Sequence, residues 1–148
     1  MKPKNAVRLD RTVGRAVYRL HLWMYRKTDG RIGRDTAQGP VILLTYTGRK
    51  SGKEYTTPLL SVPDGDGWIV VASNGGRPNH PAWYLNVKDL PDVEVQDGRR
   101  KVKAKAVVAD AERRAELWPH LFEAYEGWAH YQTLTDREIP VVELRPVS

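Results

Sequence analysis

The chain has 148 residues, a length typical of one domain that buries enough surface to fold without a disulfide or metal staple. It contains no cysteine, which excludes disulfides, thiolate metal sites and thiol chemistry, so any redox chemistry must come from a bound cofactor. The net charge of +6 lies entirely within residues 1–30, and the remaining residues are neutral overall, so no nucleic-acid partner is expected.

Residues 1–30 are predicted to form a basic amphipathic helix, from about Asn5 to Lys27, because apolar residues recur there at helical spacing. The apolar stripe consists of Leu9, Val13, Ala16, Val17, Leu20, Trp23 and Met24, and one flank carries Arg8, Arg15, Arg19 and Arg26. Either the stripe packs on the rest of the protein, or the helix lies on an anionic membrane surface. No secretory signal or membrane-spanning run is recognised. We therefore expect a cytoplasmic protein, with peripheral contact at the inner face of the cell membrane as the second interpretation.

Residues 31–40 contain helix-breaking glycine and proline and are predicted to be a linker, followed by one domain over residues 41–148. Strands are expected at 41–45, 55–62, 68–73, 93–96, 101–108 and 140–144. Pro58 within the second of these indicates an edge strand or a bulge. Helices are expected at 82–87 and 111–125, the second capped by Asp110 and kinked at Pro119. The predicted fold is α+β and mainly β: a barrel of about six antiparallel strands with helices outside.

Three segments carry candidate chemistry. The cationic turn Gly48–Lys53 lacks the spacing of a nucleotide-binding P-loop, but it is suited to an anionic cofactor tail; otherwise it is a solvated turn. In the loop Ser73–Gly76 and the following helix, glycines allow close ligand approach and Trp83 or Tyr84 offers a flat wall, unless these aromatics belong to the core. Tyr125, Trp128 and Tyr131 share a face if their segment is helical, and either line a pocket with a proton-donating phenol or belong to the core. No metal site is expected from the histidine spacing.

Together these segments resemble the deazaflavin-dependent nitroreductase family, in the A branch of the flavin/deazaflavin split-barrel oxidoreductases. The resemblance runs in order from about Val41 to the end. Its motifs are Leu44–Gly52, Pro58–Leu59, Val70–Gly76, Pro81–Asn86, Trp118–Pro119, Tyr125, Tyr131–Gln132, Thr135–Arg137 and Ile139–Pro140. It implies an FMN-binding-like split β-barrel, the cofactor coenzyme F420, and hydride transfer to a small lipophilic acceptor such as a quinone, nitro or enone compound. A homodimer is also typical of the family.

The resemblance also implies site residues. Arg49, Lys50 and Ser51 would hold the phosphate and glutamate tail of coenzyme F420. The other implied cofactor contacts are Tyr55, Thr56, Thr57, Pro58, Leu60, Val71, Ala72, Ser73, Asn74, Ala82, Trp83, Tyr84, Leu85, Asn86 and Trp128. Ser73, Tyr125 and Tyr131 match catalytic positions, where Ser73 would polarise an oxygen and a tyrosine would deliver a proton. The nitroimidazole-activating member has other residues in place of Leu60, Asn74 and Trp128, so the resemblance does not extend to that activity.

Two alternatives remain at this stage. An FMN-dependent split-barrel oxidase would use the Arg49–Lys50 turn for its single phosphate. A non-catalytic carrier would bind the deazaflavin without passing on a hydride. The hypothesis of an F420-dependent oxidoreductase requires the cationic turn and the Ser73–Gly76 loop to lie along one cleft.

Overall fold

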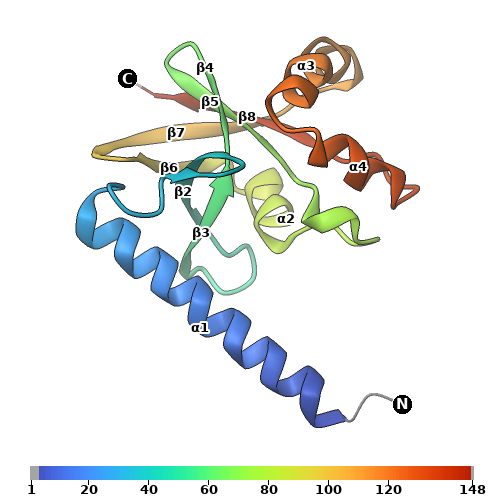
Figure 1. Cartoon of the computed structure of the whole chain (residues 1–148). Coiled ribbons are helices and arrows are strands. Elements are labelled where there is room, and N and C mark those ends of the chain that lie inside the picture. Colours follow the sequence, from blue (N-terminus) through green and yellow to red (C-terminus); the bar gives the residue numbers. More distant parts are fainter. Residues whose placement is uncertain (1–3, 148) are drawn as a thin grey trace.

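The computed structural model describes residues 4–147 and consists of an antiparallel sheet curled into an open half-barrel with four α-helices (Figure 1). The helices are α1 (Lys4–Thr28), α2 (Ala82–Asp89), α3 (Ala111–Ala124) and α4 (Gly127–Thr133). The strands are β1 (Asp35–Thr36), β2 (Gly39–Thr47), β3 (Glu54–Leu60), β4 (Val62–Asp64), β5 (Gly67–Val71), β6 (Asp92–Asp97), β7 (Arg100–Val108) and β8 (Val141–Pro146). The predicted α+β split barrel is confirmed.

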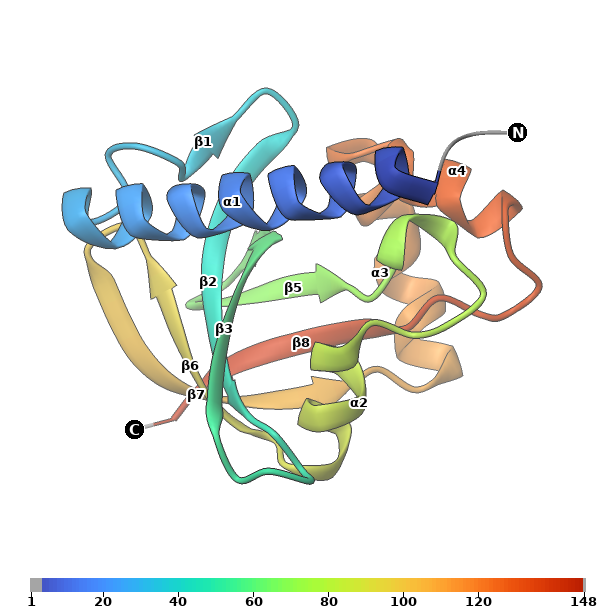
Figure 2. The same cartoon turned by 90° about the horizontal axis from the view of Figure 1, so that it is seen from below.

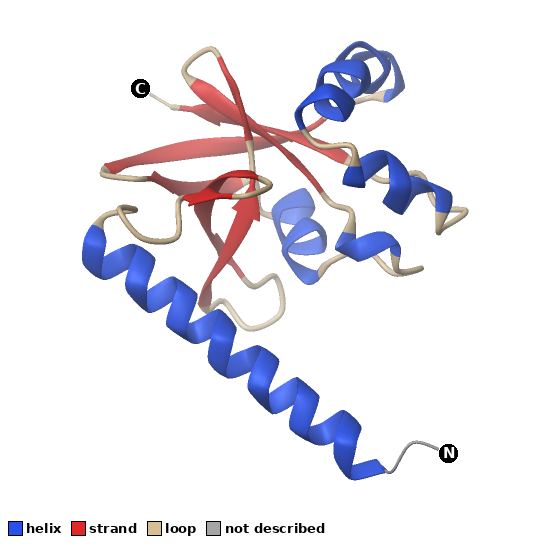
Figure 3. Cartoon of the chain, viewed as in Figure 1, coloured by secondary structure: helices blue, strands red, loops and turns tan. Residues whose placement is uncertain are grey.

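The sheet runs in the order β1-β2-β6-β7-β8-β5-β4, and β3, which is outside this order, also pairs with β2 (Figure 3). Each of the six predicted strands is present. The predicted strand 55–62 divides at Ser61 into β3 and β4, and the short β1 lies within the predicted linker. Within the described residues β3 pairs only with β2, so Pro58 lies on an edge strand, where its missing N–H costs no ladder bond.

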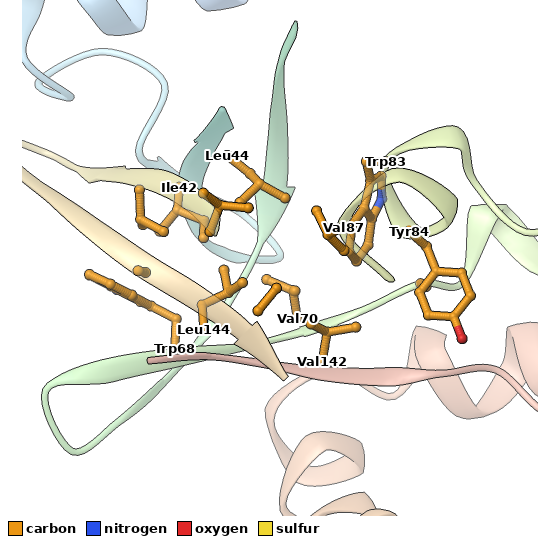
Figure 4. Packing of buried hydrophobic residues seen from close by; sticks show 14 residues of the cluster. Ile42, Leu44, Trp68, Val70, Trp83, Tyr84, Val87, Val142 and Leu144 are labelled. Atoms are coloured by element: carbon orange, nitrogen blue, oxygen red, sulfur yellow. The ribbon is translucent and has the colours of Figure 1, made fainter. Parts of the chain in front are cut away.

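Two hydrophobic clusters lie on opposite faces of β5 and β8. The first fills the half-barrel, where Ile42, Leu44 and Val70 meet Trp83 and Val87 of α2 (Figure 4). The second lies outside, where Ile69, Val71 and Val141 meet Leu117 and Leu121 of α3 and Trp128 of α4. Burial on both faces explains why all five residues of β5 are buried. The covered strand β5 ends where the candidate Ser73 loop begins.

Helix α1 contacts the barrel through a different face from the one predicted. Tyr25 is fully buried; its hydroxyl donates to the Val41 carbonyl and accepts from the Gly98 N–H, each at 2.9 Å. Leu22, one turn earlier, packs beside Tyr25. Tyr18, two turns earlier, donates its hydroxyl to the Thr56 carbonyl at 2.8 Å. Figure 2 shows α1 crossing β2 and β3. The helix is therefore attached through the face that carries Tyr18, Leu22 and Tyr25.

The predicted apolar stripe of α1 stays exposed. Val17, Leu20 and Trp23 are 61%, 55% and 59% exposed, and Arg15 and Arg19 beside them are exposed too. The side chains of Arg8, Leu9 and Val13, which belong to the predicted pattern, lie outside the described part of the structure. No helix within residues 4–147 is long and apolar enough to span a membrane. Packing on the barrel thus leaves the described part of the stripe uncovered.

The predicted helix 111–125 is present as α3, and a further helix, α4, follows it. The Asp110 carboxylate caps α3 by accepting from the Arg113 N–H at 2.8 Å, as predicted. The helix continues through Pro119 and ends at Ala124, since Tyr125 takes an extended conformation (φ −154°). Helix α4 then begins at Gly127. This break turns α4 toward the loop that follows β5.

Candidate functional site

The alternation of side chains along β3 decides which of its residues can touch a ligand. Paired residues of antiparallel strands point to the same side, so Tyr55, Thr57 and Leu59 share the inner side with Tyr46, Leu44 and Ile42. Thr56, Pro58 and Leu60 point to the other side, toward α1. There Arg26 donates to the Thr56 hydroxyl at 2.7 Å, and Leu60 packs with Tyr25. The predicted cofactor contacts at Thr56, Pro58 and Leu60 therefore face away from the cleft, whereas Leu59 of the motif Pro58–Leu59 lines it.

The cationic turn after β2 forms one end of this cleft. A pocket of about 440 Å³ is lined there by the turn residues Gly48, Arg49, Lys50 and Ser51, by Tyr46 and Tyr55, and by Ala82 and Asn86 of α2. No carboxylate is in this lining. A β-carbon on Gly48 would lie 2.6 Å from the Ser51 hydroxyl, so glycine lets the turn fold back on itself. The pocket, called the tail pocket below, can hold an anionic group by charge-assisted hydrogen bonds.

Asn86 ties the cationic turn to α2. Its side-chain oxygen accepts from the backbone N–H and the Nη1 of Arg49, both at 3.0 Å, and its amide donates to the Ala82 carbonyl at 3.0 Å. The Nε of Arg49 also lies 3.7 Å from an Asp89 carboxylate oxygen. Asn86, predicted only as a cofactor contact, thus orients the guanidinium that lines the tail pocket.

The second pocket, called the ring pocket below, measures about 560 Å³ and adjoins the first along β3. Its lining includes Thr57 and Leu59 of β3, Pro81 and Trp83 at the start of α2, Ser73, Asn74 and Arg77 of the loop after β5, and Tyr131 of α4. Thr57 follows Tyr55 on the same side of β3, and Pro81 and Trp83 flank Ala82 of the tail pocket. No described residue lines both pockets, but neighbouring residues of β3 and α2 line them in turn, so the cationic turn and the Ser73 loop lie at the two ends of one cleft along the inner side of β3.

The loop after β5 takes a tight left-handed course. Asn74, Gly75 and Gly76 have φ values of 48°, 64° and 76°. A β-carbon on Gly76 would lie 2.8 Å from the Tyr131 carbonyl, so glycine is required where the loop packs against α4. This close approach places Ser73 and Tyr131 in the lining of the same pocket.

Tyr125, Trp128 and Tyr131 do not share one helix face, because Tyr125 precedes α4. Tyr131 lines the ring pocket, whereas Trp128 is buried in the second cluster and supports the wall from behind. The ring of Tyr125 packs edge-on against Trp128 at 5.4 Å. A hydrogen bond with Tyr131, together with burial, raises the pKa of the Tyr125 hydroxyl. Tyr125 therefore keeps its proton at neutral pH and contacts Tyr131.

Other predicted contacts lie behind the cleft wall. Ala72 and Tyr84 are buried in the first cluster, and Leu85 packs against it, so none of the three lines either pocket. Val71 and Asn74 do line the ring pocket, as predicted. Pro81 and Arg77, which were not predicted, complete its rim. The predicted residues that do not line a pocket are sequence neighbours of residues that do. They face the core instead, because neighbouring residues of a strand or helix point in different directions.

A third pocket lies on the sheet over β2, β6 and β7 and measures about 350 Å³. Its lining includes the carboxylates of Glu54, Asp92 and Glu94. Like charges would repel an anionic cofactor tail there. The cleft along β3 is therefore the better candidate site.

The chain matches a known family over most of its length. The family model described as F420H(2)-dependent quinone reductase matches residues 17–146. The chain belongs to this family. An F420H(2)-dependent quinone reductase of Mycobacterium tuberculosis (strain ATCC 25618 / H37Rv) is 43% identical over 140 residues, which cover 92% of this chain and 94% of that protein.

Two solved structures are similar to this chain, and the first is an F420-dependent reductase. An F420-H2 dependent reductase (FDR-A) is 45% identical with a TM-score of 0.67, and the match covers 72% of this chain and 94% of that one. A structure described as a domain-swapped dimer is 39% identical with a TM-score of 0.70, and covers 97% of this chain and 100% of that one. The predicted deazaflavin family is thus confirmed.

As a member of this family, the protein is an oxidoreductase that uses reduced coenzyme F420 as its hydride donor. The cleft fits that cofactor. Its tail pocket presents Arg49, Lys50 and a hydroxyl for phosphate and carboxylate, and its ring pocket presents Leu59, Trp83 and other flat or apolar surface for a ring. An FMN-dependent oxidase, the alternative left open by the sequence, is not favoured by the family match.

Proposed function

We propose that this protein transfers a hydride from reduced F420, bound along β3, to a quinone in the ring pocket. The observation that carries the proposal is the junction of a cation-lined pocket with a pocket lined by Ser73 and Tyr131. A long cofactor with an anionic tail and a flat ring matches both ends of this cleft. The two ends come from segments far apart in the sequence, so the pairing is a property of the fold.

Each part of the cleft has a proposed role. Bound reduced F420 supplies two electrons and a proton as a hydride. Arg49, Lys50 and Ser51 bind the tail, while Thr57 and Leu59 support the ring and exclude water from its face. The Ser73 hydroxyl or N–H polarises the oxygen that becomes negative. Tyr131 donates a proton to the reduced quinone, and Tyr125, which packs against the same hydrophobic cluster, replaces that proton.

The function is tested by mixing the protein with reduced F420 and a menaquinone analogue and following the absorbance of oxidised F420. The expected result is saturable oxidation that requires both the protein and the quinone. Tyr131→Phe should lower kcat by about 100-fold, because a lost general acid typically costs that much or more. F420 binding without quinone-dependent oxidation would instead make the protein a carrier. Tight FMN binding without F420 binding would contradict the cofactor assignment.

We also propose that the exposed face of α1 contacts anionic lipid at the inner face of the cell membrane. Val17, Leu20 and Trp23 are exposed, and Arg15 and Arg19 lie along one flank of them, a pattern that suits the boundary between lipid tails and headgroups. A quinone dissolved in that membrane would then lie near the protein. Attachment through Tyr18 and Tyr25 leaves this face free.

Vesicle sedimentation tests the membrane contact. The protein should bind vesicles rich in phosphatidylglycerol more strongly than phosphatidylcholine vesicles, and Leu20→Ser with Trp23→Ser should abolish binding. Phe122→Ser, which removes an exposed apolar side chain on α3, is the matched control and should have no effect. The swapped dimer among the relatives supports a homodimer. A dimer lost in the α1 variant, without vesicle binding by the original protein, would assign the face to a second copy instead.

A further inference from the structure

The guanidinium of Arg137, in the segment between α4 and β8, holds both ends of the loop that follows β5. Its Nη2 donates to the Ser73 carbonyl at 2.8 Å and its Nη1 to the Ala72 carbonyl at 3.3 Å. Its Nε donates to the Arg77 carbonyl at 3.0 Å. One planar group thus satisfies three backbone acceptors that β-sheet pairing leaves free.

Arg137 reaches a fourth group, the Nδ1 of His80, at 3.1 Å. Burial, followed by the nearby charges of Arg137 and Lys88, lowers the pKa of His80. The imidazole is therefore neutral at pH 7, and its Nδ1 accepts the hydrogen bond from Arg137. His80 in turn packs on Tyr84 of α2, with ring centroids 4.8 Å apart. The guanidinium thereby connects the loop to the start of α2.

The loop held in this way forms a large part of the ring pocket. Ser73, Asn74, Gly75 and Arg77 all line it, and Tyr131 lines it from α4. The loop's own backbone bonds are few: Gly76 N–H to the Ser73 carbonyl at 2.9 Å and Arg77 N–H to the Asn74 carbonyl at 3.2 Å. Its left-handed residues include glycines that leave the chain conformationally free. The fixed shape of the pocket wall therefore depends on contacts from outside the loop.

The Arg137 carbonyl accepts from the Gln132 side-chain amide of α4 at 2.8 Å. We propose that Arg137 is a positioning residue that joins the Ser73 loop to α4 in this way and so sets the distance between Ser73 and Tyr131 across the ring pocket. Only arginine suits this position, because its rigid fork donates in several directions in one plane, whereas lysine offers a single point of charge. A misplacement of about 1 Å at a reacting centre can cost about 100-fold in rate. The expected loss of kcat rests on the proposed function, whereas the expected change in hydrogen exchange of the loop does not.

Arg137→Lys tests the proposal, and Arg114→Lys is the matched control. Arg114 is also a partly buried arginine that uses its fork, donating to the Ile139 carbonyl at 2.9 Å and the Gln132 side chain at 3.1 Å, but it does not contact the Ser73 loop. In the protein without cofactor, hydrogen exchange at Gly76 and Arg77 should become at least about 10-fold faster in Arg137→Lys. It should be unchanged in Arg114→Lys.

Kinetics complete the test. Arg137→Lys should lower kcat for reduced F420 and a menaquinone analogue by about 10- to 100-fold, while F420 affinity changes less than about 3-fold, because the tail pocket is intact. Added guanidinium ion should restore part of the activity of Arg137→Ala. Unchanged exchange and kcat in Arg137→Lys, or equal losses in Arg114→Lys, would overturn the positioning role. If loop exchange is faster in Arg137→Lys but the unmodified protein has no quinone reductase activity, Arg137 still holds the loop and the proposed function is rejected.

Discussion

Replacing Asn86 with aspartate changes the charge of the tail pocket with little change in side-chain size, although it removes the amide that donates to the Ala82 carbonyl. The new carboxylate would occupy the place of the amide oxygen that lies 3.0 Å from both the backbone N and the Nη1 of Arg49. It would neutralise one of the cations proposed to bind the F420 tail. Two opposite charges about 4 Å apart interact by roughly 1 kcal/mol in water and roughly 4 kcal/mol at an effective dielectric constant of 20. The pocket is open to solvent, so we expect a loss of about 1–2 kcal/mol, or roughly 5- to 30-fold in F420 affinity.

The opposite change provides the control. Asp89→Asn removes a carboxylate 3.7 Å from the Nε of Arg49, so F420 should bind more tightly, by up to about 5-fold. Affinity is measured by quenching of F420 fluorescence at low and high salt, and the difference between the variants should shrink as salt rises. The deazaflavin chromophore without its tail should bind both variants equally. Equal F420 affinity for Asn86→Asp and the unmodified protein would refute the assignment of the tail pocket.

Three further changes probe the fold and the proton path. Tyr25→Phe leaves the buried Gly98 N–H without its 2.9 Å partner, which costs about 1–3 kcal/mol and should lower the melting temperature by roughly 2–12 °C; an unchanged melting curve would contradict this anchor. Gly127→Ala brings a β-carbon to 2.6 Å from the Tyr125 hydroxyl, so kcat should fall while F420 affinity, from the same fluorescence titration, stays constant. Burial alone would raise the pKa of Glu143, but two arginines outweigh it and leave that pKa lowered. Its stabilisation is therefore complete above the ordinary glutamate pKa and is lost as pH falls through the lowered value, so thermal melts of Glu143→Gln should depend less on pH in this acidic range.

Much of the fold could be predicted from local sequence patterns. Strand periodicity, the turn glycines and the Asp110 cap are local signals, and each of the six predicted strands is present in the sheet. The break after Ala124 has a weaker local signal: Gly127 accommodates the Tyr125 ring, but only tertiary packing shows this. Two short strands, β1 and β4, were missed because strands of two or three residues have no detectable period.

The structure brings both predicted ends of the site into one cleft but turns several of the residues predicted for its walls away from that cleft. The turn at Arg49 and the loop at Ser73 were identified because unusual residue types mark them. The register of β3 was not used, so Leu60 was preferred to Leu59, although pairing with β2 turns Leu60 toward α1. Nothing local predicts that Arg137 bonds carbonyls more than sixty residues earlier in the chain.

The face that anchors α1 is another property that sequence periodicity could not give. The hydrophobic stripe of Val17, Leu20 and Trp23 is the stronger pattern, yet the helix attaches through Tyr18 and Tyr25. Tyrosine hydroxyls find backbone partners at the barrel edge, and this requirement of hydrogen bonding outweighs the burial of aliphatic side chains there. The face of α1 that carries Val17, Leu20 and Trp23 therefore stays exposed and can contact a partner.

The most direct test of the account is a crystal structure of the protein with bound F420. The account predicts the phosphate and glutamate tail beside Arg49 and Lys50, and the deazaflavin ring between Thr57 and Tyr131. Cofactor bound instead over β2, β6 and β7, in the pocket lined by Glu54 and Glu94, would contradict it.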